Sequence, residues 1–194
     1  MGIRASTGKY IGIINSGDIY YSHNILKYIS SIISKNPSVN LIYGNLYYFN
    51  SFNIVREWNI KTQNFNTIDP LKIPHPTAFI KKDIFIKNKY YSVNYKISSD
   101  LDFFLKSKKN FDKRNFYINK YFIYMKEGGL STSVRTVLIK IFEDISILFF
   151  YYSLFFIYFY LKKVFIKIPG FFSLKNEHKL YNRFLARLIE VSRK

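Results

Sequence analysis

The sequence contains no cysteine among its 194 residues, so a disulfide framework and a cysteine-ligated metal site are excluded. A reducing cytoplasmic setting is therefore allowed. The first residues, Met1 to Ala5, show no apolar run of the secretory-signal kind, and we expect no export signal there. A chain of this length can bury one ordinary core, which predicts one domain with an appendage at most.

Acidic residues are scarce as well. The chain has 12 Asp and Glu against 30 Lys and Arg, a formal net charge of +18. Such a charge favours a polyanionic neighbour, which includes nucleic acid, an anionic membrane surface and a phosphorylated substrate. Lys, Ile, Asn, Tyr and Phe are abundant together, as in proteins from AT-rich genomes, so part of the basicity is compositional. Charge alone does not choose among these partners.

A short apolar run near the start of the chain, Tyr10–Ile14, is rich in β-branched residues and is bounded by Gly8 and by the polar turn Asn15–Asp18. This pattern predicts a buried, central parallel strand that ends in a turn. Ligands of open α/β sheets bind beyond the carboxyl ends of the strands, where Asp18 would lie. The alternative is a plain strand-to-helix turn in which Ser22 caps the next helix.

The run Gly8–Asp18, with the sequence GKYIGIINSGD, resembles the metal-binding segment of family 2 glycosyltransferases. It is most similar to the subgroup that builds bacterial cell-surface polysaccharides. The resemblance implies that Asp18 helps to hold a divalent cation, Mn or Mg, against the diphosphate of a nucleotide-sugar donor. It also places Asn15, Ser16 and Gly17 beside that diphosphate. Many relatives carry Asp where this chain has Gly17, so the turn offers a single carboxylate.

The next elements follow from periodicity and composition. Ser22–Lys35 carries apolar residues at spacings of three and four, which predicts a helix with one buried face. Val39–Phe49 is apolar and rich in β-branched and aromatic residues, which predicts a strand interrupted at Gly44 and Asn45. Ile54–Ile60 predicts a second strand, antiparallel to the one before it. The fold class is therefore α/β.

His75 lies between two prolines in the segment Ile73–Lys82, and these prolines rigidify the backbone around it. We expect no helix through that point. The segment resembles a motif of the glycosyltransferase family, and this resemblance implies that His75 reaches the donor diphosphate or the acceptor. A histidine held by hydrogen bonds in a loop is an equally good interpretation.

The second informative segment surrounds Asp100 and Asp102. Ser98 or Ser99 is suited to cap a helix, whose first turn then contains both carboxylates, where the helix dipole favours them. The buried stripe of this helix is predicted to consist of Leu101, Phe104 and Leu105. These features explain the helix without any function.

The same segment resembles the family's acceptor-side motif. This resemblance implies that Asp100 is the general base that deprotonates the acceptor hydroxyl, with Asp102 on the acceptor side. Many relatives have Glu where this chain has Ser99. A further strand is predicted over Asn115–Met125, and the glycines after it resemble the family's G-G-x-S phrase. That phrase implies acceptor-side roles for Gly129 and Ser131, which alternatively form a plain loop and a helix cap.

The C-terminal part is hydrophobic and then basic. Ile145–Leu161 contains 17 residues without a charge, which is the lower limit of a transmembrane span. An interfacial helix and a helix packed on the domain are the alternatives. Residues 162–194 contain nine Lys and Arg against two Glu, 9 − 2 = +7, and their last part is amphipathic. This pattern favours an anionic membrane surface, the alternative being a dimerising or core-packing helix.

Together these features predict the C-terminal portion of a GT-A (Rossmann-like) mixed sheet flanked by helices, with a helical tail. Residues 1–133 would form a partial glycosyltransferase domain without its first nucleotide-binding strand-helix-strand unit, and residues 134–194 the tail. The chain would then be a fragment of a longer enzyme, a decayed copy, or one half of a split pair in which a second chain supplies the missing N-terminal half.

The predicted activity is inverting transfer of a sugar from a nucleotide-sugar donor to a glycan or lipid-linked acceptor, in the cytoplasm at the inner face of the membrane. A catalytically inactive membrane-associated remnant is one alternative. A basic nucleic-acid-binding protein is another alternative. Against it, the basic residues are scattered, and the sequence shows no helix-turn-helix, no zinc-ligand spacing and no aromatic Gly-Phe motif of the RNA-binding kind.

Overall fold

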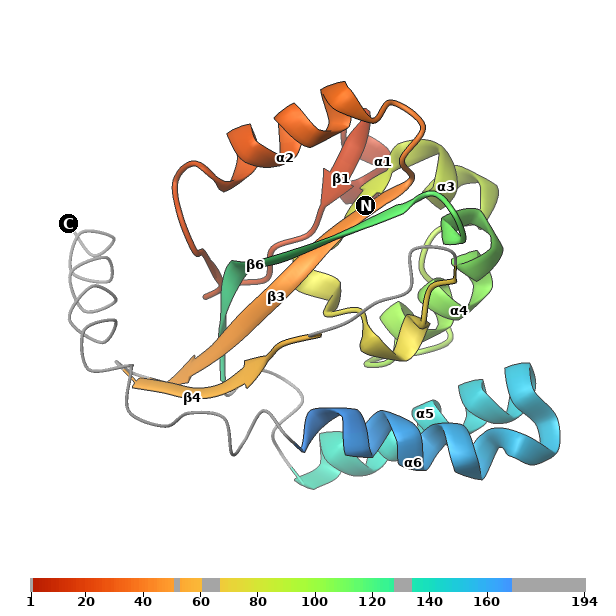
Figure 1. Ribbon diagram of the computed structural model, residues 1–194. Coiled ribbons are helices and arrows are strands. Elements are labelled where there is room, and N and C mark those ends of the chain that lie inside the picture. Colours follow the sequence, from red (N-terminus) through yellow and green to blue (C-terminus); the bar gives the residue numbers. More distant parts are fainter. Residues whose placement is uncertain (1, 51–52, 61–66, 128–133, 169–194) are drawn as a thin grey trace.

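The computed structural model describes residues 2–50, 53–60, 67–127 and 134–168, and it shows a curled mixed sheet with helices on both faces (Figure 1). The sheet has six strands in the order β1-β5-β3-β6-β2, with β4 paired to β3 beside this path. Its strands are β1 (Tyr10–Gly12), β2 (Ile19–Tyr20), β3 (Leu41–Asn50), β4 (Asn53–Trp58), β5 (Phe79–Lys81) and β6 (Asn115–Lys126). The predicted strands at 39–49, 54–60 and 115–125 are confirmed within a few residues.

Strand β3 is the centre of the sheet because nearly all its side chains are apolar or aromatic, and nine of its ten residues are buried. It pairs with β6 in parallel and with β4 and β5 antiparallel. The predicted interruption is confirmed, since the β3–β6 register shifts between Tyr43 and Asn45. A Cβ on Gly44 would lie 2.7 Å from the carbonyl oxygen of Lys120, so this irregular pairing requires glycine.

Helices cover the two faces of the sheet. On one face lies α2 (Ile25–Lys35), whose Ile25, Ile29 and Ile32 pack with Phe122 and other sheet residues. On the other face lie α3 (Lys82–Lys87) and α4 (Ser99–Phe111). The predicted α4 stripe is confirmed, because its residues are buried, as are Phe103 and Phe111. The remaining short elements are α1 (Gly2–Ala5) and the 3-10 turns η1 (Pro70–Lys72) and η2 (His75–Thr77).

Two predictions near the N-terminus are wrong. The run Tyr10–Ile14 is not a central parallel strand: β1 ends at Gly12, lies at one end of the sheet and pairs antiparallel with β5. An apolar run does not by itself distinguish a central strand from a short outer one. The helix predicted from Ser22 begins at Ile25, and the Ser22 hydroxyl accepts a hydrogen bond from the Asn24 N–H instead of capping it.

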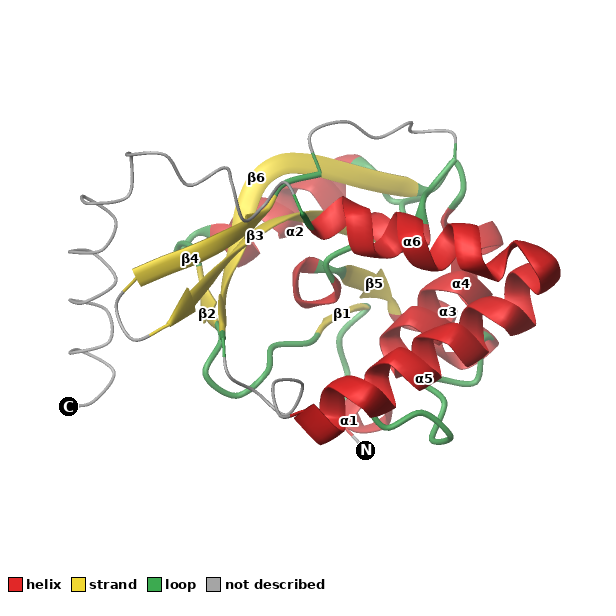
Figure 2. Ribbon diagram, turned by 90° about the horizontal axis from the view of Figure 1, so that it is seen from below, coloured by secondary structure: helices red, strands yellow, loops and turns green. Residues whose placement is uncertain are grey.

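The hydrophobic stretch near the C-terminus forms a helical hairpin. It consists of α5 (Val134–Tyr152), a 3-10 turn η4 (Ser153–Phe155) and α6 (Phe156–Lys167). The two helices meet at η4 and diverge from it (Figure 2). Ile147 and Leu148 pack α5 against α4. The division between residues 133 and 134 remains a prediction, and the basic segment 169–194 lies outside the described residues.

By length and composition alone, the helical stretch Thr136–Lys167 could cross a membrane, and only 17% of its most apolar window is buried. However, the chain turns back at η4. This reversal brings Lys163 of α6 to within 2.6 Å of Asp144 of α5. The apolar residues 145–161 therefore belong to two helices and the turn between them.

Candidate active site

The loop that carries His75 is fixed to the central strand. Thr77 is fully buried, and its hydroxyl lies 2.9 Å from the carbonyl oxygen of Gly44 and 2.8 Å from that of Pro74. The prediction of no helix at this point is wrong, because His75–Thr77 form a single 3-10 turn despite the two prolines. A turn this short needs few backbone donors, so Pro76 fits within it. His75 is thus held in place through its neighbours.

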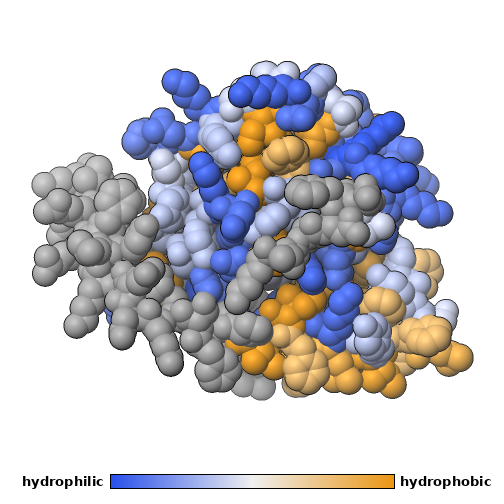
Figure 3. All heavy atoms as spheres, viewed as in Figure 1, coloured by the Kyte–Doolittle hydropathy of each residue, from blue (hydrophilic) through white to orange (hydrophobic). Residues whose placement is uncertain are grey.

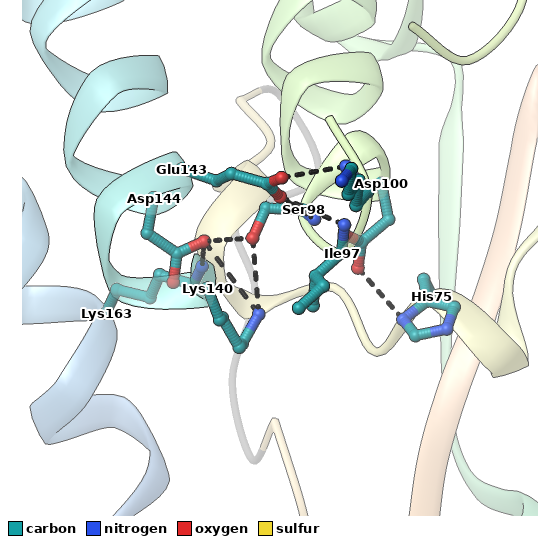
Figure 4. Close-up of polar contacts among 9 residues, drawn as sticks. His75, Ile97, Ser98, Asp100, Lys140, Glu143, Asp144 and Lys163 are labelled. Carbon is teal, nitrogen blue, oxygen red and sulfur yellow. Dashed lines mark hydrogen bonds and ion pairs between the residues drawn. The ribbon is translucent and has the colours of Figure 1, made fainter. Parts of the chain in front are cut away.

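His75 lies directly against the first turn of α4. Its Nδ1 is 3.0 Å from Oδ2 of Asp100, and each side chain is 31% exposed (Figure 4). Burial raises the pKa of Asp100, but the charge and hydrogen bond of His75 outweigh it, assisted by the charges of Lys140 and Lys163. The pKa of this carboxyl is consequently held well below its usual range. Asp100 therefore stays ionised at neutral pH while remaining accessible.

The backbone before Asp100 is held by α5. The Glu143 carboxylate accepts hydrogen bonds from the backbone N–H groups of Lys96, Ile97 and Ser98 at 2.8, 2.9 and 2.9 Å (Figure 4). These bonds lower the pKa of Glu143 although burial opposes them. A single buried carboxylate thus satisfies three donors at the start of α4, and it fixes the turn that presents Asp100.

A second acidic residue of α5, Asp144, also holds the start of α4. We call Glu143 and Asp144, with their bonds to the segment before α4, the α5 anchor. Ser98 occupies the N-cap position, as predicted, but its hydroxyl makes no capping bond and donates to Asp144 at 2.6 Å. Asp144 also accepts from Lys163 of α6 at 2.6 Å, and Lys140 lies 3.8 Å from the same carboxylate. Sequence reasoning missed this anchor. Its signal is an adjacent Glu143-Asp144 pair inside a mostly apolar helix, where unpaired buried charges would be costly.

Asp18 lies in the turn between β1 and β2. Its backbone N–H donates to the carbonyl oxygen of Asn15, and its Oδ1 accepts from the Lys126 N–H at 3.0 Å. Gly17 has a φ of 88°, in the left-handed region that favours glycine. This conformation gives a structural reason for glycine where many relatives of the resembled family have Asp.

One oxygen of Asp18, Oδ2, is buried and has no hydrogen-bond partner among the described residues. Burial raises the pKa of Asp18, and the hydrogen bonds from Lys126 and Asn15 and the charge of His75 oppose this only in part. A buried carboxylate oxygen without a partner is unusual, because its desolvation is not compensated. Asp18 is therefore short of a positive partner on that oxygen.

Asp18 and Asp100, 82 positions apart in the sequence, interact electrostatically with the same residues. His75 contacts Asp100 and its charge also acts on the pKa of Asp18. Tyr48 of β3 responds to both: burial raises its pKa, Arg56 opposes this, and the two carboxylates raise it further. The Arg56 guanidinium lies 3.7 Å from the Tyr48 ring centroid. Sequence reasoning missed both residues; the available signal is the Arg56 cation in a predicted strand next to the aromatic strand β3, where it pairs with Tyr48.

The other predicted site residues are placed as follows. Asn15 and Ser16 are exposed in the Asp18 turn. Asp102 is buried and accepts a hydrogen bond from the Tyr151 hydroxyl of α5 at 3.1 Å, so it faces the hairpin. Its acceptor-side role stays a prediction. Gly129 and Ser131 lie outside the described residues.

A metal site built from protein side chains alone is not found: no group of three His, Asp or Glu residues converges among the described residues. A Mg or Mn ion at a diphosphate takes most of its ligands from phosphate and water, with one or two protein carboxylates. The unpartnered Oδ2 of Asp18 fits that smaller requirement. Asp18 is thus the residue suited to hold such a cation.

The fold was compared with known proteins. One similar solved structure is S. aureus TarS 1-349 in complex with UDP-GlcNAc, with a TM-score of 0.56 and 14% identity over 91% of this chain and 55% of that one. TarS 1-349 in complex with UDP gives a TM-score of 0.54 and 15% identity, over 91% and 48%. This chain has the GT-A fold.

The comparisons extend to the fold and no further, because the identity is low. No family model matches the sequence, and no curated protein matches it. The chain spans about half the length of TarS 1-349. The predicted fold class, a mixed GT-A sheet flanked by helices, is confirmed over most of the chain. The activity and the roles of individual residues need evidence of their own.

Proposed function

We propose that this chain, alone or as part of a longer or two-chain enzyme, transfers a sugar from a nucleotide-sugar donor to a glycan or lipid-linked acceptor with inversion. The observation that carries the proposal is that Asp18, whose buried Oδ2 has no partner among the described residues, lies near enough to the His75–Asp100 pair for the charge of His75 to act on it, within a GT-A fold. Binding of UDP-GlcNAc by the similar TarS structure makes a uridine nucleotide the first donor to test.

On the donor side, the turn Asn15–Asp18 would receive the diphosphate. Asp18 would hold a divalent cation, Mn or Mg, through Oδ2, and this cation would neutralise the departing nucleoside diphosphate. The exposed Asn15 and Ser16 offer hydrogen bonds to phosphate oxygens. His75, which contacts Asp100 and whose charge also acts on Asp18, would face the diphosphate or the acceptor.

On the acceptor side, Asp100 would accept the proton of the attacking hydroxyl. The hydroxyl oxygen forms the new bond to the anomeric carbon as the bond to the diphosphate breaks on the opposite face, which inverts the configuration. His75 donates a hydrogen bond that keeps Asp100 ionised, and Glu143 fixes the backbone before it. The base is therefore oriented before the acceptor arrives, as efficient proton transfer requires.

The other proposed partners follow from this chemistry. A lipid-linked acceptor would place the protein at the inner face of the cytoplasmic membrane, and a second chain or further sequence would supply the nucleoside-binding half.

The experiment is calorimetric titration of the full chain with UDP, with and without Mn. We expect Mn-dependent binding, and Asp18→Asn should weaken it by at least tenfold because the carboxylate ligand is lost. Asp83→Asn is the matched control, since Asp83 lies on α3 with a side chain 73% exposed, away from the site. Binding that is absent from the folded wild-type chain, or equally strong in Asp18→Asn, would contradict the proposal and favour an inactive remnant.

A further inference from the structure

The outer face of the α5–η4–α6 hairpin is apolar and uncovered. Fourteen large hydrophobic side chains with exposures between 37% and 87% lie in this hairpin or directly after it, against four in the rest of the described chain. The most exposed are Leu154 (87%), Phe150 (76%), Phe142 (73%) and Phe155 (71%). Figure 3 shows hydrophobic atoms gathered along the lower edge of the molecule, where Figure 1 places α5 and α6. Soluble monomers rarely expose such a continuous apolar surface, so this face is suited to an apolar partner.

We propose that this face lies on the surface of an anionic lipid bilayer, with the hairpin in the plane of the membrane and the turn η4 inserted most deeply. The proposal goes beyond sugar transfer and stands or fails independently of it. Leu154 and Phe155 are the inserted residues of the turn. Amphipathic helices of this kind bury their apolar face at the boundary of headgroups and acyl chains.

The charges of the hairpin fit this partner. Residues 134–168 contain five Lys and Arg and two acidic residues, 5 − 2 = +3. Both acidic side chains, Glu143 and Asp144, are turned inward, with residue exposures of 7% and 5%, and are bonded to the segment before α4. The described outer face thus presents no carboxylate to repel anionic headgroups.

The hairpin lies along the membrane in this proposal and does not cross it. In one straight helix Asp144 and Lys163, 19 residues apart, would be separated by about 28 Å, at 1.5 Å per residue. Their contact at 2.6 Å keeps α6 folded against α5. Because Glu143 and Asp144 also bind the segment that presents Asp100, the inner face of the hairpin belongs to the domain and only the outer face is available to lipid.

A second copy of the chain is a less suitable occupant. Each copy carries a formal charge of +18, so two copies brought together through this face repel one another. An anionic bilayer instead attracts the same charge. Of the two apolar partners, a second copy and a bilayer, the overall charge of the chain therefore favours the bilayer.

The test is co-sedimentation of the full chain with vesicles of phosphatidylcholine alone or mixed with phosphatidylglycerol. We expect binding to the mixed vesicles that weakens, without vanishing, at high salt. Leu154→Glu/Phe155→Glu should lower the partition coefficient at least tenfold. Val93→Glu is the matched control, because Val93 is 95% exposed in the loop before α4, and it should change binding less than twofold.

Phe142→Glu repeats the test on a separate turn of α5, so that the result does not depend on the folding of η4. Equal binding of the wild type and both hairpin variants would overturn the proposal. Sedimentation velocity gives the second decisive outcome: a wild-type dimer that the hairpin variants dissociate would assign the face to another copy. Failure of UDP binding would leave the membrane proposal intact.

Discussion

Asp100 and Asp18 are held in opposite ways. Asp100 lies at the start of α4, paired with His75 and supported by buried bonds from α5, and its pKa is lowered. Asp18 lies in an exposed turn between short strands, one of its oxygens is buried without a partner among the described residues, and its pKa is raised. The first carboxylate is already paired with His75, whereas Oδ2 of the second has no hydrogen-bond partner among the described residues.

This difference matches the two roles proposed for them. A base must be ionised and oriented when the acceptor arrives, so its partners belong to the protein. A ligand that shares a cation with a diphosphate gains its partner only with the substrate. The free protein therefore tolerates a destabilised carboxylate at Asp18, and the strain is relieved on binding.

The largest effect on activity is expected for Asp100, the carboxylate that is already paired. Asp100→Asn removes the base while keeping its shape, and should lower kcat/KM about 10³-fold, or about 4 kcal/mol in activation free energy. The measurement is steady-state transfer from a UDP-sugar, with Asp83→Asn as the control. Mn-dependent UDP binding should persist in Asp100→Asn. An Asp100→Asn enzyme with wild-type activity would remove the distinction between the two carboxylates.

The anchor beneath Asp100 can be broken separately. Asp144→Asn leaves Lys163, whose side chain is 11% exposed, without its charge partner and should lower the free energy of unfolding by about 3 kcal/mol. Urea unfolding measures this loss. Adding Lys163→Met should recover most of it, because no buried charge then remains. If Asp144→Asn is as stable as the wild type, the anchor contributes little to holding the site.

The sequence predicted the parts of this molecule that local patterns encode. The buried stripe of α4 and the apolar strands β3 and β6 are strong periodic or compositional signals, and all three are confirmed. The position of β1 depended on which strand it pairs with, and the hydrogen bond of Ser98 depended on Asp144, 46 residues later. The Glu143-Asp144 pair indicates that α5 needs polar partners, but no local pattern shows which distant residues those partners are.

The same limit applies to the candidate site. Resemblance singled out Asp18, His75 and Asp100 as candidate site residues, because each lies in a local motif similar to one of the glycosyltransferase family. Tyr48, Arg56 and Glu143 were not, because only the fold brings them to the neighbourhood of the carboxylates. Local patterns thus pointed to the residues for which we propose a chemical role, whereas the residues that contact them were visible only in the structure.

The smallest expected effect is the change in the free energy of unfolding when the Asp18 carboxylate is replaced. Folding raises the pKa of Asp18 above its ordinary value of 3.8, so the folded state binds its proton more readily than the unfolded state. Its contribution to stability therefore falls as pH rises from 3.8 through the raised pKa, and it stays unfavourable at pH 7. Asp18→Asn, which keeps an acceptor for the Lys126 N–H, should raise the free energy of unfolding at pH 7 by about 0.5 kcal/mol.

Urea midpoints at pH 7 and at pH 4 measure this change, and the gain should shrink as the wild-type carboxyl becomes protonated at the lower pH. Asp100→Asn should behave oppositely: its lowered pKa makes the charge stabilising above the ordinary value, so the variant should lose stability at pH 7. A destabilised Asp18→Asn would mean that the ionised carboxylate already has a favourable partner in the free protein. The contrast between a satisfied base and a carboxylate awaiting its cation would then be wrong.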